Sequence, residues 1–241
     1  MNGRLFNRSI VIRIGSLCVL LTVLLSSTAC STLQHRSTII DWIDFVKIGD
    51  DTYTGLWDGV LRDSDTVTDE AVGTVKKKLE GRVNSPNYRS RSGDAAFLEK
   101  GTKLYRVEGF EPEEAVAVRS DEQIGGYKLY VRDGFKELPS SQFGPITETK
   151  LASAAIYRIG ETQPLRELSG DELERFVKLL RSGTDASDYA WNSPNDPQYY
   201  SVVFDTGEPI LYTLPIWDDG KKVIFQETRE LEAEVRELLA P

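Results

Sequence analysis

The stretch from Tyr199 to Phe225 decides the fold, and it reads YYSVVFDTGEPILYTLPIWDDGKKVIF. Apolar side chains alternate in its first part, where Tyr200, Val202 and Phe204 share one face of a strand, and the alternation continues over residues 210–216. Residues 205–208 and 218–221 are turn sequences, each with a glycine in its third position. The stretch therefore predicts an antiparallel meander of three strands.

Outward from this meander, helices and one further strand complete a small layer. Residues 154–159 read as a strand, and Ser169 with Glu172 forms a capping box that predicts a helix start. A second helix is expected over about residues 227–239, with Leu231, Val235 and Leu238 buried. The order β-α-β-β-β-α over residues 147–241 predicts helices on one face of an antiparallel sheet.

The preceding part of the chain is rich in short strands. Residues 39–48 and 52–57 predict a hairpin, and residues 102–107, 115–118 and 127–131 predict further strands. Residues 72–83 fit either a twisted strand, which we favour, or a short amphipathic helix. The fold class expected is α+β, mainly antiparallel β: a small barrel- or sandwich-like domain over 39–138, followed by the α+β domain over 147–241.

The first 29 residues have the pattern of a signal peptide. Arg4, Arg8 and Arg13 precede an apolar run from Ile14 to Leu25, and the small residues Ser26 to Ala29 follow it. The alternative is an uncleaved transmembrane anchor, but a spanning helix needs about 20 apolar residues, more than this run provides. We therefore expect residues 1–29 to be removed on export.

Cys30 directly follows the small residues and resembles the modified cysteine of the bacterial lipoprotein lipobox, although Ser27 stands where that pattern prefers Leu, Val or Ile. The resemblance implies that Cys30 is acylated and becomes the new N-terminus. The alternative is ordinary signal-peptidase cleavage, which would leave an unpaired cysteine, an unusual residue in an exported protein. In the favoured interpretation, residues 30–38 are a lipidated cysteine and a short polar tether.

Three internal stretches add a second resemblance. Gly93 to Tyr105, with Val107 and Gly109, and the Asp44–Lys47 and Tyr53–Leu56 stretches are similar to segments of uncharacterised lipoproteins of Gram-positive bacteria. The resemblance covers about residues 40–132. It implies an extracytoplasmic location and a strand over 72–83, but it brings no catalytic residue and no ligand.

Composition excludes several chemistries. Beyond the N-terminal segment, which holds Met1, Cys18, Cys30 and His35, the chain has no Met, Cys or His, so residues 39–241 contain no Cys–His or Ser-His-Asp catalytic set and no His- or Cys-ligated zinc. The net charge is −9, and loss of three leader arginines makes the remainder more acidic still. An acidic body does not suit nucleic acid, whose phosphates require basic side chains. We expect no cofactor and no metal.

Acidic residues form the first group of candidate functional residues. They concentrate at Asp50-Asp51, at Asp63-Ser64-Asp65 with Asp69-Glu70, and at Asp218-Asp219. Paired carboxylates serve glycoside hydrolysis, and oxygen ligands suit calcium, but each group lies in an expected turn, where Asp caps the backbone. We favour the turn role, and we assign no catalytic residue.

Aromatic residues form the second group, at Tyr189, Trp191, Tyr199 and Tyr200. An exposed aromatic platform offers a large contact area for a sugar or a peptide at a low cost in entropy. The alternative, which we favour, is that Trp191 and one or both tyrosines of the Tyr199-Tyr200 pair fill the core.

These observations predict a lipid-anchored lipoprotein on the extracytoplasmic face of the cell membrane. Its expected role is non-enzymatic, either structural or the binding of an envelope protein, a peptide or a wall component. The alternative is a carboxylate-dependent cell-envelope hydrolase.

Replacing the expected acylation site tests the anchor. We expect Cys30→Ala to abolish incorporation of radiolabelled palmitate and to shift the protein out of the membrane fraction, because two acyl chains are what stable anchoring requires. Cys18→Ala, which changes the leader alone, should retain the label. Label that persists in Cys30→Ala would contradict acylation at this residue.

Overall fold

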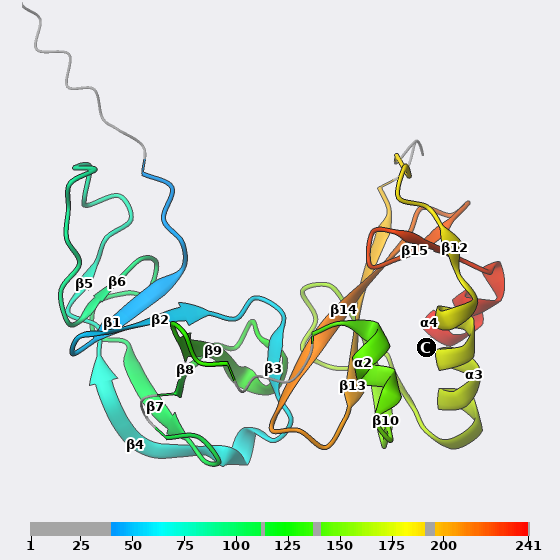
Figure 1. The fold of residues 1–241 in the computed structure, drawn as a ribbon, viewed down its shortest axis with the longest axis horizontal. Helices are drawn as coiled ribbons and strands as arrows, with labels where there is room; N and C mark the ends of the chain where they lie inside the picture. The colour runs from blue at the N-terminus through cyan, green and yellow to red at the C-terminus, as the bar shows by residue number, and fades with distance from the viewer. Residues whose placement is uncertain (1–39, 112–113, 137–140, 191–195, 241) are drawn as a thin grey trace, which may run out of the picture. The chain divides into compact units, whose positions relative to one another are not determined.

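A computed structural model describes residues 40–111, 114–136, 141–190 and 196–240. Residues 40–241 group into one compact unit that contains two eight-stranded sheets (Figure 1). The leader, Cys30 and the tether lie outside the described residues, so their expected roles remain predictions. In the described part, no helix has both the length and the apolar character that crossing a membrane requires. The predominance of antiparallel strands, with few helices, confirms the predicted α+β, mainly β class.

The first sheet is built within residues 45–132 and curls into a half-barrel. Its strand order is β4-β7-β8-β9-β2-β1-β6-β5, and every neighbouring pair is antiparallel except β5 with β6. The strands are β1 (Phe45–Ile48), β2 (Asp51–Gly55), β4 (Val67–Thr74), β5 (Lys77–Lys78), β6 (Asp94–Ala95), β7 (Lys103–Val107), β8 (Ala115–Arg119) and β9 (Tyr127–Arg132).

The second sheet contains the predicted meander. Its order is β11-β10-β13-β14-β15-β16-β12, and the short strand β3 also pairs with β14. The strands are β3 (Gly59–Leu61), β10 (Ser153–Arg158), β11 (Arg166–Leu168), β12 (Thr184–Asp185), β13 (Gln198–Asp205), β14 (Ile210–Asp218), β15 (Val223–Phe225) and β16 (Arg229–Leu231). The hairpin predicted at residues 218–221 is confirmed: Asp218 accepts from the Gly220 amide, and Asp219 accepts from the Lys221 and Lys222 amides.

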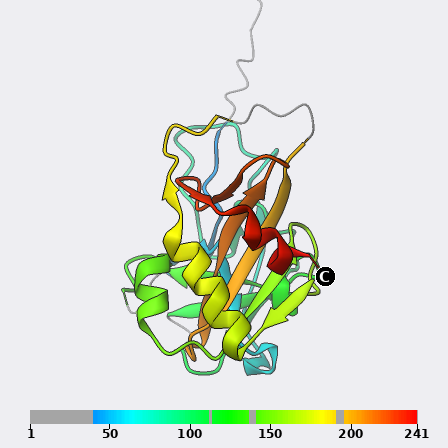
Figure 2. The ribbon, with the colours of Figure 1, turned by 90° about the vertical axis from the view of Figure 1, so that its right-hand side faces the viewer.

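Helices cover one face of the second sheet, as the segment order predicts (Figure 2). Leu173, Phe176 and Leu180 of the longest helix pack with Tyr200, Val202 and Phe204 of β13 in one apolar core. The described helices are α2 (Phe143–Glu148), α3 (Gly170–Ser182) and α4 (Arg236–Leu239), with 3₁₀ turns η1 (Ser64–Thr66), η2 (Ile124–Gly126) and η3 (Ala233–Val235).

Two local expectations about the helices need correction. Ser169 is the N-cap of α3, but its side chain makes no capping bond, and Glu172 instead accepts from Arg166 at 2.6 Å. The expected helix over 227–239 is wrong in its first part, because Gln226 and Glu227 adopt positive φ and reverse the chain into β16. The three residues expected to be buried there, Leu231, Val235 and Leu238, do reach the core.

Residues 72–83 contain no helix. They hold the end of β4 and the two-residue β5, followed by a turn. Val75 and Leu79 are fully buried, although the segment is not one continuous strand. The preference for an extended conformation over a helix is confirmed, but the strand is broken between Thr74 and Lys77.

A buried ion pair holds the start of the first sheet. The Asp44 carboxylate is almost fully buried, and it is paired with Lys128 and accepts from the Tyr130 hydroxyl at 3.1 Å. Burial, followed by the nearby Asp44 charge, raises the pKa of Tyr130, so this hydroxyl remains a donor. A Cβ on Gly55 would lie 2.7 Å from the Asp44 carboxylate, so this position requires glycine.

Removing the Asp44 carboxylate should destabilise the fold. We expect Asp44→Ala to lower the free energy of unfolding by about 3 kcal/mol, near the lower end of the range for breaking a buried pair, because the Lys128 ammonium is partly exposed and can hydrate. Urea unfolding measures the change. Asp41→Ala, at an exposed aspartate of the same segment, should change stability by less than about 0.5 kcal/mol. Equal effects of the two substitutions would show that the pair contributes nothing.

Candidate functional site

The face of the second sheet opposite the helices carries a row of half-buried and exposed side chains. Directly opposite residues of antiparallel strands share a face. The register pairs Tyr157 with Ser201, Ser201 with Pro215, and Tyr199 with Trp217. These residues therefore face away from the helix-covered core. We call this surface the open face and define it as Tyr157, Ile159, Tyr199, Ser201, Pro215 and Trp217.

Aromatic side chains gather at one end of the open face. Tyr199 and Trp217 meet edge to face with their ring centroids 6.1 Å apart, and Tyr199 is 38% exposed. Ile159, which is bonded through its amide to the Tyr199 carbonyl, is 63% exposed. Large apolar side chains left accessible in this way mark a contact surface more often than isolated exposed residues do.

The predicted aromatic group divides between the core and the surface. Tyr200 is only 7% exposed and packs in the helix-side core. Successive side chains of a strand point to opposite faces, so Tyr200 and its neighbour Tyr199 lie on different sides of β13. Tyr189 donates to Asp219 at 2.7 Å and lies close enough to Tyr199 for the two groups to interact electrostatically. Trp191 lies outside the described residues. Sequence reasoning missed Trp217. Side chains alternate between the two faces of a strand, so Trp217 points to the face opposite that of the expected core residue Ile216.

A groove adjoins the other end of the open face. Its cavity volume is about 330 Å³, and it lies where β3, η1 and η2 meet the second sheet. Val60, Val203 and Leu211 form its apolar floor, with Ile124 and Tyr157 packed against them. Polar side chains surround this floor, among them Arg62, Asp63, Ser153, Thr162 and Asp205.

An ion pair and a tyrosine set the polar character of the groove. The Arg62 Nε donates to Asp205 Oδ1 at 2.8 Å, and the Gly207 amide donates to the same oxygen at 2.9 Å. Burial, with a smaller contribution from Glu167, raises the pKa of Tyr157. Tyr157 therefore keeps its proton at neutral pH and can serve as a hydrogen-bond donor.

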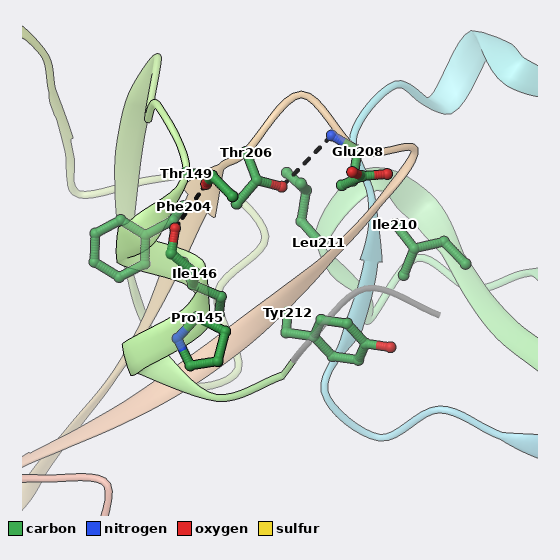
Figure 3. A pocket seen from close by; sticks show the side chains of 9 residues that line it. All are labelled: Pro145, Ile146, Thr149, Phe204, Thr206, Glu208, Ile210, Leu211 and Tyr212. Atoms are coloured by element: carbon green, nitrogen blue, oxygen red, sulfur yellow. Dashed lines mark hydrogen bonds between the residues drawn. The ribbon is translucent and has the colours of Figure 1, made fainter. Parts of the chain in front are cut away.

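A second hollow lies between α2 and the β13–β14 hairpin (Figure 3). Its cavity volume is about 190 Å³, and its walls are mainly apolar, from Pro145, Ile146, Phe204, Ile210 and Tyr212. Thr206 and Glu208 line it from the hairpin turn, where the Glu208 amide is 3.5 Å from the Thr206 hydroxyl. Its lining contains one carboxylate and no basic side chain, so its chemistry differs from that of the groove.

The predicted carboxylate groups are dispersed. Asp63 accepts from the Asp65 amide, Asp218 is paired with Arg236, and Asp69 is within 3.5 Å of Arg119. Among the described residues, no three acidic, histidine or cysteine side chains come together to hold a metal ion. The calcium role considered for these acidic groups therefore has no supporting cluster of ligands among the described residues. Asp63 and Asp205 do line one groove, and each already accepts a backbone amide.

The Tyr189–Asp219 contact predicts a pH dependence of stability. Burial, the hydrogen bond to Asp219 and nearby negative charge raise the pKa of Tyr189 to about 12, from an ordinary value near 10. The unfolded chain therefore loses this proton first, and the stability that the tyrosine contributes is present below about pH 10 and is lost as the pH rises to about 12.

We expect Tyr189→Phe to make the fall in unfolding free energy between pH 10 and pH 12 shallower, as measured by urea unfolding. Asp219→Asn should act in the same direction, because it removes the negative charge beside the hydroxyl. A slope unchanged in both variants would show that the contact does not perturb Tyr189.

No family model, curated protein or solved structure matches the chain.

Proposed function

We propose that this chain is an exported, lipid-anchored binding protein of the extracytoplasmic membrane face, and that the open face of its second sheet holds the ligand. The observation that carries the proposal is the contrast between the two faces of this sheet. One face is sealed by α2, α3 and α4, whereas the other presents Tyr199 and Ile159 to solvent beside Trp217. A face left open with aromatic contact area is typical of a binding surface.

The leader pattern supplies the location in this proposal. An apolar run after three arginines, followed by small residues and Cys30, supports export and acylation. The proposed tether, within residues 30–38, has few residues, and each spans at most about 3.5 Å. The tether is therefore short. The open face would then work close to the membrane, within reach of envelope proteins and wall components.

Hydrolysis is the second candidate function, and one observation favours it. Asp63 and Asp205 line the same groove, and a pair of carboxylates is what glycoside hydrolysis requires. Arg62 and the Gly207 amide both bind Asp205 Oδ1, and the Asp65 amide binds Asp63. These contacts give each carboxylate a structural role, so we place binding first.

Photo-crosslinking in living cells tests the binding surface. With p-benzoylphenylalanine in place of Tyr199, we expect a covalent adduct in the membrane fraction, detected as a change in electrophoretic mobility, because the ring is exposed on the open face. The matched control is the same replacement at Lys178, an exposed residue of α3 on the helix-covered side. Equal crosslinking at the two positions, or none at Tyr199, would contradict the proposal.

A further inference from the structure

We propose that the groove and the open face together bind a straight, β-linked polysaccharide, with a pyranose ring seated beside Arg62 and Asp205. This assignment rests on the binding role proposed above and names the ligand class for the same surface. It is argued from four features: the polar pair, the apolar floor, the position on the face of a sheet, and the row of aromatic residues that continues from the groove.

The polar pair offers donors and an acceptor side by side. Asp205 Oδ1 is fixed by Arg62 Nε and the Gly207 amide, so the carboxylate has a set orientation. In the described part of the chain, no hydrogen bond involves the Arg62 Nη atoms or Asp205 Oδ2, so these remain available to a ligand. A sugar hydroxyl both donates and accepts, and two neighbouring hydroxyls match a guanidinium beside a carboxylate oxygen.

The floor of the groove supplies the apolar contact that a sugar ring also requires. A pyranose has faces lined by C–H groups and a rim of hydroxyls, and the groove likewise combines an apolar floor with a polar edge. Val60, Val203 and Leu211 form that floor, and Tyr157 packs against it. The cavity volume of about 330 Å³ lies at the lower end of the range of about 300–1,000 Å³ for ligand pockets.

The position of the groove disfavours an extended peptide. Peptides that add to a sheet pair with the backbone of an edge strand. The groove lies on the face of β10, β13 and β14, and the backbone groups of β13 are paired with β10 on one side and β14 on the other. On the sheet side of the groove, recognition therefore comes from side chains, and those available are hydroxyls, one guanidinium, carboxylates and aromatic rings.

The open face extends the proposed binding surface beyond the space that one sugar ring occupies. From Asp205 to Tyr199 the strand β13 advances six residues, which at about 3.3 Å per residue is roughly 20 Å. Tyr157, at the edge of the groove, is opposite Ser201 and therefore lies between Asp205 and the Tyr199–Trp217 pair in this register. A straight row of contacts fits a glycan whose linkages keep successive rings in line, as β-1,4 bonds do, rather than one that coils.

Calorimetric titration of the full chain in detergent micelles tests the assignment. Cellotetraose and chitotetraose are the β-linked probes, and maltotetraose and tetra-alanine are the comparators. We expect heat of binding from at least one β-linked probe and from neither comparator. Arg62→Lys should weaken that binding about tenfold, because it keeps the charge and loses the planar fork.

A matched variant separates recognition from general surface charge. Arg119→Lys changes an exposed arginine of the first sheet and should leave the affinity unchanged. Thermal unfolding of both variants confirms that they are folded. Equal losses in Arg62→Lys and Arg119→Lys would overturn the assignment of the groove.

The remaining outcomes distinguish this inference from the proposed function. Binding of tetra-alanine in place of the glycans would overturn the saccharide assignment in favour of a peptide. No heat from any glycan, together with crosslinking at position 199 in cells, would overturn the saccharide and leave the binding role standing. Absence of both would overturn the two proposals together. Release of reducing ends from cellotetraose would overturn non-enzymatic binding and assign hydrolysis.

Discussion

Strand β14 pairs with two different strands along one of its edges. The organisation of the described chain depends on this change of partner. The first three residues of β14 pair with β3, and its last three pair with β15, while β13 occupies the other edge. Ile210 and Tyr212 consequently share a core with Leu61 and Val107, whereas Leu214 and Ile216 belong to the helix-side core. One strand of nine residues thereby belongs to two cores, and the groove forms beside its β3-paired end.

Local sequence pattern predicts most of the second sheet, because alternation and turn chemistry act between neighbouring residues. The β13–β14–β15 meander follows from the alternation in β13 and β14 and from the turn sequence at residues 218–221. The pairing of β3 with β14 does not, since three residues carry no periodicity and their partner lies about 150 positions away. The first part of the predicted C-terminal helix is wrong for a related reason. Leu231, Val235 and Leu238 have helical spacing, but a turn at Gln226 and Glu227 and pairing with β15 determine the path of the chain before η3 and α4.

The aromatic residues of the candidate site can be predicted from the sequence, but the grouping of the groove residues in space cannot. Tyr199 belongs to the predicted aromatic group. The alternation of side chains along a strand is enough to place Tyr199 and Tyr200 on opposite faces and to place Trp217 on the same face as Tyr199. The groove is different, because Arg62, Tyr157 and Asp205 come from three segments that only the tertiary fold brings together. No spacing in the sequence connects an arginine after β3 with an aspartate at the end of β13.

The placement of β1 determines how the folded unit can begin to open at its N-terminal side. Strand β1 lies inside its sheet, paired with β2 on one side and β6 on the other, and the Asp44 carboxylate just before it is buried against Lys128 and Tyr130 of β9. Detaching β1 would break its hydrogen bonds to β2 and to β6 and would separate the buried Asp44–Lys128 pair in the same event. The N-terminal side of the folded unit should therefore open as one cooperative step rather than fray residue by residue.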